Sequence, residues 1–356
     1  MLKIELLPAR FGDCIWIDYG DAAHSYRVLI DGGTRGTRKD IKKRLNRISG
    51  DRRFELLVVT HIDRDHIEGV LDLLSQDDPG FLVRDLWFNG WCHLPDNPED
   101  EKFGAVQGEK LTDRIVKLGW CWNQDFAGKA VVVPEGGELP VHELPGGLKL
   151  TLLSPTPDKL ITLKPTWEAE VRKNNLDPGF ALEPNDVAET EVEIFAPMEL
   201  PDVRALADSP FDEDDSPANG SSIAFLAEFE GKRLLLAGDA HPSVLNNTLH
   251  RLSPNKPLAL DLCKLPHHGS DHNVSRELLG NLSCERYVFS TNGSIYHHPD
   301  PAAVSRVIVG GGDYPELIFN YRSAHNQIWE LPLLRNRHHY RVSYPDPDQE
   351  GIVIEL

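Results

Sequence analysis

The sequence predicts a mixed α/β fold with two series of strands and helices between them. Three observations support this. The first thirty residues alternate between apolar and polar positions, as short antiparallel strands do. An apolar strand at 54–60 runs directly into a polar loop and a helical pattern, which makes a βα unit. A hairpin at 221–237 then opens a second series of strands.

The first series of elements can be followed in order. Strands are expected around 4–6, 14–19 and 26–30, and Asp31-Gly32-Gly33 closes the third. Apolar residues at helical spacing predict a helix within 39–48. After the strand at 54–60 we expect, in order, a helix from 67, a strand at 82–89, a helix around 111–118, and strands at 130–133 and 148–153.

The segment at about 156–217 differs in composition from what precedes it. Prolines recur along it, and acidic residues dominate from Glu183 to Asp215. Such a composition favours irregular, solvated chain. We therefore expect an insertion at about 156–217, partly disordered or a lid, within a single domain that spans 1–356. Its acidic part, Glu183 to Asp215, is expected to be an irregular excursion near the entrance of the site. A plain surface excursion is favoured over a lid or a docking surface for a protein partner.

Regular pattern resumes with the hairpin, whose strands lie at 221–229 and 233–237 and lead into Gly238-Asp239. A helix to about 252 and strands at 260–265 and 287–291 complete the second series. The chain of 356 residues is 40% hydrophobic, which is enough for a large core.

Charge and cysteine content exclude several classes of protein. A net charge of −19 disfavours tight binding of duplex nucleic acid through a basic face. No apolar run is long enough for a membrane span, and the N-terminal residues mix charge into a short apolar run, so we expect no membrane contact and a cytoplasmic location. Five scattered cysteines indicate reduced, mostly buried thiols rather than a disulfide framework.

Residues that bind metals gather in four loops that follow or adjoin predicted strands. His61, Asp63, Asp65 and His66 alternate around one turn, and the other three loops carry Asp239, the pair His267-His268 and the pair His297-His298. Each loop alone is a weak signal, because an aspartate after glycine is most often a turn and a lone histidine is most often structural. Loops at one end of a sheet converge in space, so four together predict a metal site.

This pattern resembles a known family. Thr60–Gly69 is similar to the H-x-D-x-D-H form of the metallo-β-lactamase motif, in which aspartate replaces the commoner second histidine. That form is typical of ComEC-type competence hydrolases and of teichoic-acid phosphorylcholine esterases. The other matching segments, all within 1–310, are Gly12-Asp13, Leu29–Gly33, Asn219–Ser222, Leu236–Ala240, Leu265–Ser270 and His298–Pro301. The resemblance implies an αββα sandwich, with two mixed β-sheets flanked by helices.

The resemblance also implies roles for individual residues. One divalent ion would be held by His61, Asp63 and either His267 or His268, the other by Asp65, His66 and His298, with Asp239 bridging both. The residues expected to take part in catalysis are Asp65, His267 and His268. Those expected to support the ligands are Asp13, Asp31, Asn219 and Ser221. The third metal histidine of β-lactamases has no counterpart here, a substitution that ComEC-type sequences share.

The predicted function is hydrolysis by water that two divalent ions, zinc or manganese, activate. The resemblance favours a phosphodiester, either single-stranded nucleic acid, as for a nuclease, or a small nucleotide; a role in DNA transport does not carry over. The nearest cations for a phosphate are Arg64 and Lys264, although each could equally be an ion-paired surface charge. No serine lies in a G-x-S-x-G elbow, which argues against acyl-enzyme chemistry. The alternative is a sensor or binding component of a multi-gene bacterial defence-type system with little turnover.

Overall fold

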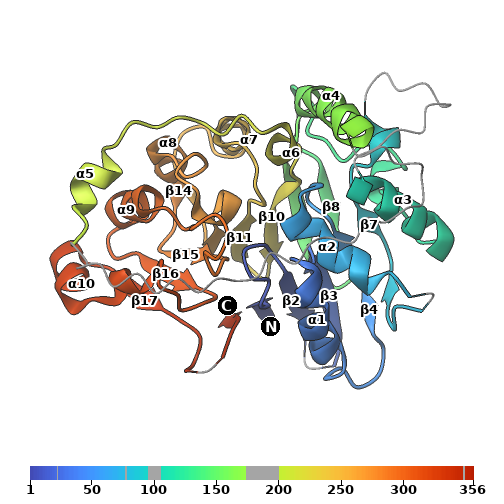
Figure 1. The fold of residues 1–356 in the computed structure, drawn as a ribbon, viewed down its shortest axis with the longest axis horizontal. Helices are drawn as coiled ribbons and strands as arrows, with labels where there is room; N and C mark the ends of the chain where they lie inside the picture. Colours follow the sequence, from blue (N-terminus) through green and yellow to red (C-terminus); the bar gives the residue numbers. More distant parts are fainter. Residues whose placement is uncertain (22, 77, 95–105, 174–199, 348) are drawn as a thin grey trace.

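The computed structural model describes all residues except 22, 77, 95–105, 174–199 and 348. One six-stranded sheet contains the start of the chain and its last strand (Figure 1). Its β1–β3 meander is antiparallel, as predicted, while β5 and β7 add in parallel, so the sheet is mixed. In spatial order its strands are β18 (Ile352–Glu355), β1 (Leu2–Leu6), β2 (Ile15–Gly20), β3 (Ser25–Ile30), β5 (Leu56–Val58) and β7 (Leu86–Trp87).

The second sheet has eight strands and is also mixed. Strands β17 to β11 are parallel to one another, and β10, β9 and β8 continue the sheet antiparallel. In spatial order the strands are β17 (Arg341–Ser343), β16 (Glu316–Phe319), β15 (Arg286–Phe289), β13 (Leu262–Lys264), β11 (Lys232–Leu236), β10 (Ala224–Phe229), β9 (Lys149–Ser154) and β8 (Val141–Glu143). The predicted hairpin is therefore the pair β10–β11.

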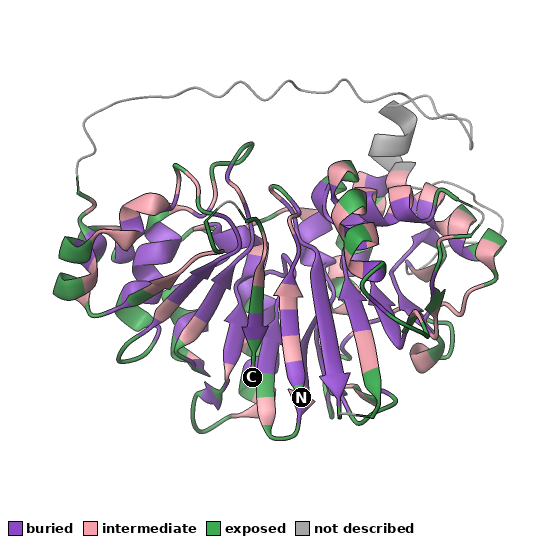
Figure 2. Ribbon diagram, turned by 90° about the horizontal axis from the view of Figure 1, so that it is seen from below, coloured by how far each residue is buried: buried purple, intermediate pink, exposed green. Residues whose placement is uncertain are grey.

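The sheets pack face to face, with helices on both outer sides. Between the sheets, the ring of Tyr19 lies 5.6 Å from Phe229, and that of Trp87 lies 6.2 Å from Phe225. Most strand residues are buried, as Figure 2 shows. The first sheet is covered by α1 (Arg38–Leu45), α2 (Arg64–Leu73) and α3 (Val106–Leu118), and the second by α7 (Pro242–Leu252), α8 (Arg276–Gly280) and α9 (Pro301–Gly310). This confirms the predicted αββα sandwich.

Smaller elements complete the fold. Two short strand pairs join β4 (Arg53–Phe54) to β6 (Leu82–Val83) and β12 (Leu258–Ala259) to β14 (Leu282–Ser283). The strands predicted at 54–60 and 82–89 are thus each divided into two short strands. Helix α10 spans Pro332–His338, and 3-10 helices lie at Arg35–Thr37, Trp91–His93, Gln124–Phe126, Pro266–Gly269 and Gln327–Glu330.

The prediction of a strand at 130–133 is wrong. That segment pairs with no strand among the described residues, and at Val131 a side chain takes the place of a partner backbone. The amide of Asn89 accepts a hydrogen bond from the Val131 backbone N–H and donates one to the Val131 carbonyl. Val131 and Val133 are nonetheless buried in the core.

The insertion predicted at about 156–217 begins with a helix, which its proline-rich composition did not predict. Helix α4 spans Pro157–Lys173, although Pro165 lies inside it. Leu160, Leu163 and Trp167 follow helical spacing and are buried against the first sheet's helical layer, which outweighs the cost of the proline. Helices α5 (Val203–Ala207) and α6 (Pro217–Gly220) end the segment. The acidic stretch predicted from Glu183 lies outside the described residues as far as residue 199.

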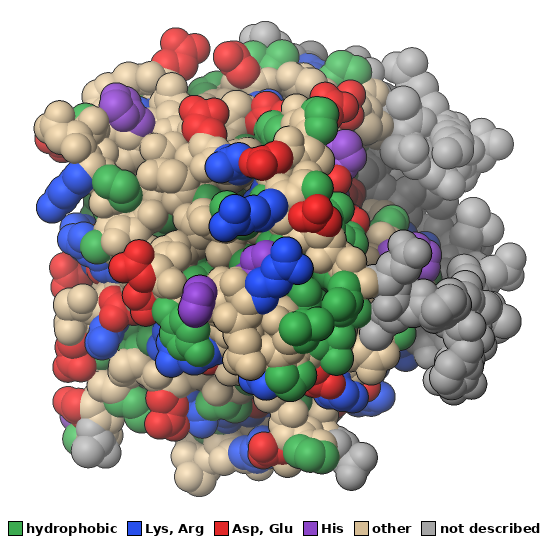
Figure 3. All heavy atoms as spheres, turned by 90° about the vertical axis from the view of Figure 1, so that its left-hand side faces the viewer, with side chains coloured by type: hydrophobic (Ala, Val, Ile, Leu, Met, Phe, Trp, Pro, Cys, Tyr) green, Lys and Arg blue, Asp and Glu red, His purple; other side chains and the backbone are tan. Residues whose placement is uncertain are grey.

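The surface and the cysteines agree with the composition. On the face shown in Figure 3, acidic and basic side chains are interspersed. All five cysteines are free; Cys14, Cys263 and Cys284 are buried, whereas Cys92 is exposed. Within the described part of the chain, no helix has the length and hydrophobicity needed to cross a bilayer.

Candidate metal centre

The loop after β5 supplies four potential ligands in one turn. Strand β5 delivers His61 to the edge of the sheet, and Asp63 is the N-cap residue of α2. The Asp63 carboxylate makes no capping bond and lies 3.6 Å from Nε2 of His61. Asp65 and His66 are buried in the first turn of α2, where the helix dipole favours the negative charge of Asp65.

Three buried histidines hold Nδ1 in a fixed hydrogen bond. Nδ1 of His66 lies 2.7 Å from the Asp31 carboxylate, and Nδ1 of His268 lies 2.8 Å from the Ser290 carbonyl. The Thr60 hydroxyl donates to Asp31, so its oxygen accepts the proton of His61 Nδ1 at 3.0 Å. In all three rings Nδ1 therefore carries the hydrogen, which leaves Nε2 for a metal.

The three Nε2 atoms converge on one carboxylate oxygen. Oδ2 of Asp239 lies 3.2 Å from Nε2 of His66, 3.6 Å from that of His268 and 3.7 Å from that of His61. Asp65 Oδ2 joins the group at 3.3 Å from His268 Nε2. His61, Asp65 and His66 come from the turn after β5, whereas Asp239 follows β11 and His268 follows β13.

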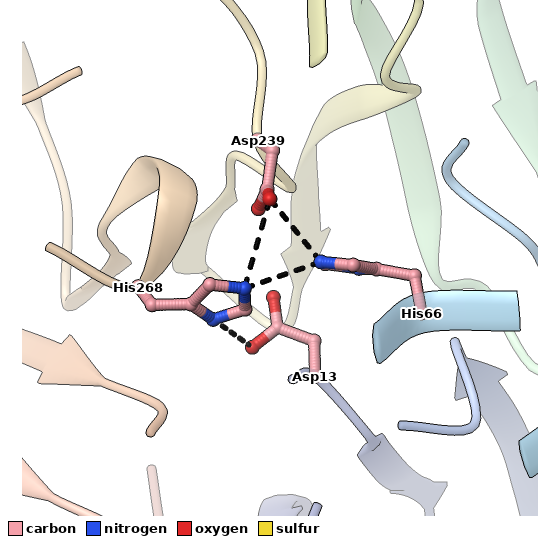
Figure 4. Close-up of side chains that lie close together, drawn as sticks. All are labelled: Asp13, His66, Asp239 and His268. Atoms are coloured by element: carbon pink, nitrogen blue, oxygen red, sulfur yellow. Dashed lines mark hydrogen bonds and ion pairs between the residues drawn. The ribbon is translucent and has the colours of Figure 1, made fainter. Parts of the chain in front are cut away.

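Asp13 is a further buried carboxylate beside this group. Together with His66, Asp239 and His268 it forms a buried set whose ligand atoms lie within 4.8 Å of one another (Figure 4). The carboxylate of Asp13 forms an ion pair with Lys264, which is itself buried. The suggestion that Lys264 could hold a phosphate is therefore wrong, because that cation is enclosed in the core and neutralises Asp13.

A glycine permits this close packing. The backbone N–H of Asp13 donates to the Asp65 carbonyl at 3.2 Å, which draws the β1–β2 loop against α2. A Cβ on Gly12 would lie 1.8 Å from the Asp65 carbonyl oxygen. Only glycine lets the loop with Asp13 approach the helix with Asp65.

The charges in the group reinforce one another. Burial alone would raise the pKa of Asp239, but the imidazoles of His66 and His268 hold it well below its usual value. Burial alone would lower the pKa of His268, but Asp239 and Asp13 raise it to about 9. The carboxylates thus stabilise positive charge at this place. A divalent ion would supply the same charge and displace the protons.

Two buried polar atoms in the group have no hydrogen-bond partner, as expected of atoms that bind a metal ion. Oδ1 of Asp239 and Nε2 of His61 make no hydrogen bond, although each is buried. Such orphaned atoms are costly unless a ligand or an ion satisfies them. The donor set of imidazoles and carboxylates is one that zinc and manganese both accept. The described residues therefore form a group that could hold a metal.

His267 and His298 lie outside this group. Nδ1 of His267 is 2.9 Å from Oδ1 of Asn273 and 3.5 Å from Asp214, and a quarter of its side chain is exposed. His298 Nδ1 pairs with Asp300 at 3.1 Å, and its ring centroid lies 5.3 Å from that of His267. Among the described residues, no hydrogen bond or ion pair joins His298 to Asp65 or His66, the residues with which the resemblance grouped it.

The backbone at His267 and His268 is strained, and this strain turns their two side chains in different directions. His267 and His268 have φ values of 45° and 53°, in the left-handed region. Such conformations cost on the order of 1–3 kcal/mol each and concentrate at functional sites. Here they turn one ring into the buried group and the other towards the surface.

The other two residues predicted to support the ligands also differ: Asn219 lies near His267, whereas Ser221 lies at the end of α6. The amide of Asn219 donates to Asp214 at 2.7 Å and lies 3.4 Å from Nδ1 of His267. Ser221 instead donates to the Ala218 carbonyl at 2.6 Å and caps α6. Its neighbour Ser222, which the sequence did not single out, accepts the backbone N–H of Asp239 at 3.0 Å.

Two further residues were missed. Asp214 lies in the acidic run that was taken for solvated surface, yet it is mostly buried, and hydrogen bonds from His267 and Asn219 lower its pKa despite burial. Asn273 follows the His267-His268 motif and binds Asp214 as well as His267. Their signal in the sequence was weak, because asparagine and aspartate are common in turns.

Comparison with known proteins finds similarity to solved structures alone, at low sequence identity. No protein-family model matches the chain, and no curated protein matches it. Among solved structures, Zn²⁺-bound PqqB from Methylobacterium extorquens aligns with 12% identity and a TM-score of 0.44, covering 100% of both chains.

Two other solved structures align over nearly their whole length. The metallo-β-lactamase fold protein YhfI from Bacillus subtilis has 10% identity and a TM-score of 0.41, with 100% of this chain and 99% of that one covered. Human tRNase Z, short form, has 9% identity and a TM-score of 0.37 at the same coverage. These scores are low, so the similarity assigns neither a substrate nor an activity to this chain.

Proposed function

We propose that this protein is a metallo-β-lactamase-fold hydrolase that cleaves phosphodiesters with two divalent ions. The observation that carries the proposal is the convergence of Nε2 of His61, His66 and His268 on Oδ2 of Asp239. All three rings are oriented through Nδ1, an arrangement that metal-binding histidines share. A structural cluster would have no need to leave three imidazole nitrogens facing one carboxylate.

The geometry supports two overlapping ligand sets. His61 and Asp63 would hold one ion, and Asp65, His66 and His268 the other, with Asp239 shared between them. This assignment selects His268 from the His267-His268 pair and gives it the place that the resemblance gave to His298. The ligand set is rich in carboxylates, so manganese competes with zinc.

When bound, such ions generate a nucleophile from water at neutral pH and offset charge on the attacked phosphate. The chain's own residues prepare the site for this. Asp31 and the Ser290 carbonyl fix the tautomers of His66 and His268. The ion pair of Asp13 with Lys264 keeps the floor of the site neutral, so that Asp63, Asp65 and Asp239 supply the negative charge for the ions.

His267 faces the substrate in this proposal. Its Nδ1 proton is held by Asn273 and Asp214, so Nε2 is the atom free to meet a ligand. Burial alone would lower the pKa of His267, but Asp239 and Asp214 raise it. A donor at this place would bind a phosphate oxygen or protonate the leaving oxygen.

Within phosphodiesters, a nucleotide or single-stranded nucleic acid is favoured. The net charge of −19 offers no broad basic surface for a duplex. Arg64, a cation within the candidate metal loop, has 62% of its side chain accessible, although Glu68 pairs with it at 2.8 Å. The alternative, a sensor with the same metal group and little turnover, makes the opposite prediction for catalysis.

A matched pair of variants tests the proposal. Hydrolysis of bis(p-nitrophenyl) phosphate is measured with added manganese or zinc for the parent, His268→Ala and His250→Ala; His250 is an exposed histidine on α7. We expect metal-dependent turnover in the parent and in His250→Ala, and its loss in His268→Ala. A parent that binds metal but turns over nothing would support the sensor instead.

A further inference from the structure

A continuous series of rings leads from the buried metal group to the surface. Starting at His268, the ring centroids are 5.9 Å from His267, then 5.3 Å on to His298, and then 6.2 Å on to Tyr296. Phe11 meets Tyr296 edge to face at 5.8 Å. The outer end is open, since 57% of Tyr296 is exposed.

The loop that carries these rings is held in place on both sides. Its Asn292 N–H donates to the Arg10 carbonyl at 2.7 Å, which ties the loop to the segment with Phe11 and Asp13. At the other end, the Asp300 N–H donates to the Gly269 carbonyl at 3.0 Å, beside His268. Tyr296 is therefore presented by the same backbone that positions the metal group.

The rings of Tyr296 and His298 are stacked with their centroids 6.2 Å apart, so Tyr296 lies next to the outer histidine. The pKa of Tyr296 is raised by burial first and then by the carboxylates of Asp65 and Asp63, which are two of the proposed ligands. Exposed aromatic residues scattered singly are normal and need no function. Tyr296 differs because its ring is packed against Phe11 and His298, and His298 in turn contacts His267.

We propose that Tyr296, whose ring Phe11 meets edge to face, forms a platform on which a nucleobase stacks while its phosphodiester lies at the metal group. A nucleobase is the flat aromatic group that is joined to a phosphodiester, and stacking on an aromatic side chain tolerates any base because each has a π-face. The proposal rests on the proposed phosphodiesterase function and narrows its substrates to nucleotides and single-stranded nucleic acid.

The test compares two esters with the same leaving group. One is thymidine 5′-(p-nitrophenyl phosphate), which has a base, and the other is methyl p-nitrophenyl phosphate, which has none. The readout is the ratio of kcat/KM for the first ester over the second, in the parent, Tyr296→Ala, Tyr296→Phe and Tyr314→Ala. Tyr314 is a control, since it is 45% exposed but stacks with Arg341 just before β16, at the end of the sheet away from the site.

We expect Tyr296→Ala to lower this ratio about tenfold or more, within the range that base stacking on one side chain contributes. Tyr296→Phe should keep the ratio, because it keeps the ring, and so should Tyr314→Ala. An unchanged ratio in Tyr296→Ala, or an equal fall for both esters, would overturn the platform.

Binding separates this proposal from the function on which it rests. Thymidine 5′-monophosphate and methyl phosphate are titrated calorimetrically into the same four proteins. We expect Tyr296→Ala to weaken only the nucleotide, by a similar factor. If no protein hydrolyses either ester, the proposed phosphodiesterase fails, while selective loss of nucleotide binding would still support the platform. Equal nucleotide affinity in the parent and Tyr296→Ala would refute it in either case.

Discussion

The inner and outer histidines of this site each place Nδ1 against a polar neighbour, but their rings face in different directions. His61, His66 and His268 each fix Nδ1 against a hydroxyl, a carboxylate or a carbonyl, and turn Nε2 inward to Asp239. Nδ1 of His267 is likewise held by Asn273, and Nδ1 of His298 forms an ion pair with Asp300, but these two side chains are partly exposed, by 25% and 13%. The difference separates residues that could hold an ion from residues that could meet a substrate.

His267 and His268 show the clearest contrast between an outer and an inner histidine. His267 and His268 are adjacent, and both have left-handed backbone, yet only His268 is fully enclosed, with 1% of its side chain exposed. The structure therefore supports different tasks for two residues that the sequence could not distinguish.

Asp239→Asn should remove most metal binding and lower phosphodiester hydrolysis by orders of magnitude. The change keeps the size of the side chain but removes the charge on which the inner histidines converge. The core strands are untouched, so the variant should fold. Metal content, melting temperature and rate are measured together. A variant that retains both its ions and its rate would show that Asp239 is not a shared ligand.

His267→Ala should keep its metal but lower kcat about 10²-fold to 10⁴-fold, the contribution typical of a positioned proton donor. His268→Ala should instead lose metal. Metal analysis of the two variants side by side measures the split. Loss of metal from both, or from His267→Ala alone, would break the division between inner and outer histidines.

Asp31→Asn should weaken metal binding about 10-fold to 100-fold, which is the usual effect of removing a partner that orients a ligand histidine. Its carboxylate accepts from His66 and from the Thr60 hydroxyl. Asp300→Asn is the matched control, because Asp300 pairs with the outer His298. Competition with a chromogenic chelator gives both affinities. Equal weakening in the two variants would count against the inner group as the metal site.

Arg64→Ala should have the smallest effect. Arg64 lies between two candidate ligands in the sequence, but 62% of its side chain is exposed, and Glu68 is its one ion-pair partner among the described residues. We expect the free energy of unfolding to change by about 0.3–0.5 kcal/mol and metal affinity to stay the same. Chemical denaturation and chelator competition measure the two quantities. A large loss of metal would mean that Arg64 organises the loop.

Much of the fold could be predicted from periodicity. The β1–β3 meander, the βα unit from β5 to α2 and the β10–β11 hairpin each have a clear local pattern. The errors arose where tertiary contacts override local pattern. Composition suggested irregular chain where α4 buries Trp167, and apolar residues suggested a strand where the side chain of Asn89 pairs with Val131.

The candidate site was predictable as a set of loops but not as a geometry. Strand ends indicated where His61, His66, Asp239 and His268 would meet, because loops at one end of a sheet converge. The position of His298, the buried pairing of Lys264 and the contribution of Asp214 depend on side-chain direction. No spacing in the sequence encodes that direction.

Metal analysis of the purified protein tests the central claim most directly. The protein is stripped with chelator and titrated calorimetrically with manganese and with zinc, and the bound ions are counted by elemental analysis. The account predicts two divalent ions for each chain, with both lost on substitution of Asp239 and His268 together. A parent protein that binds neither ion would contradict the metal centre and every proposal that depends on it.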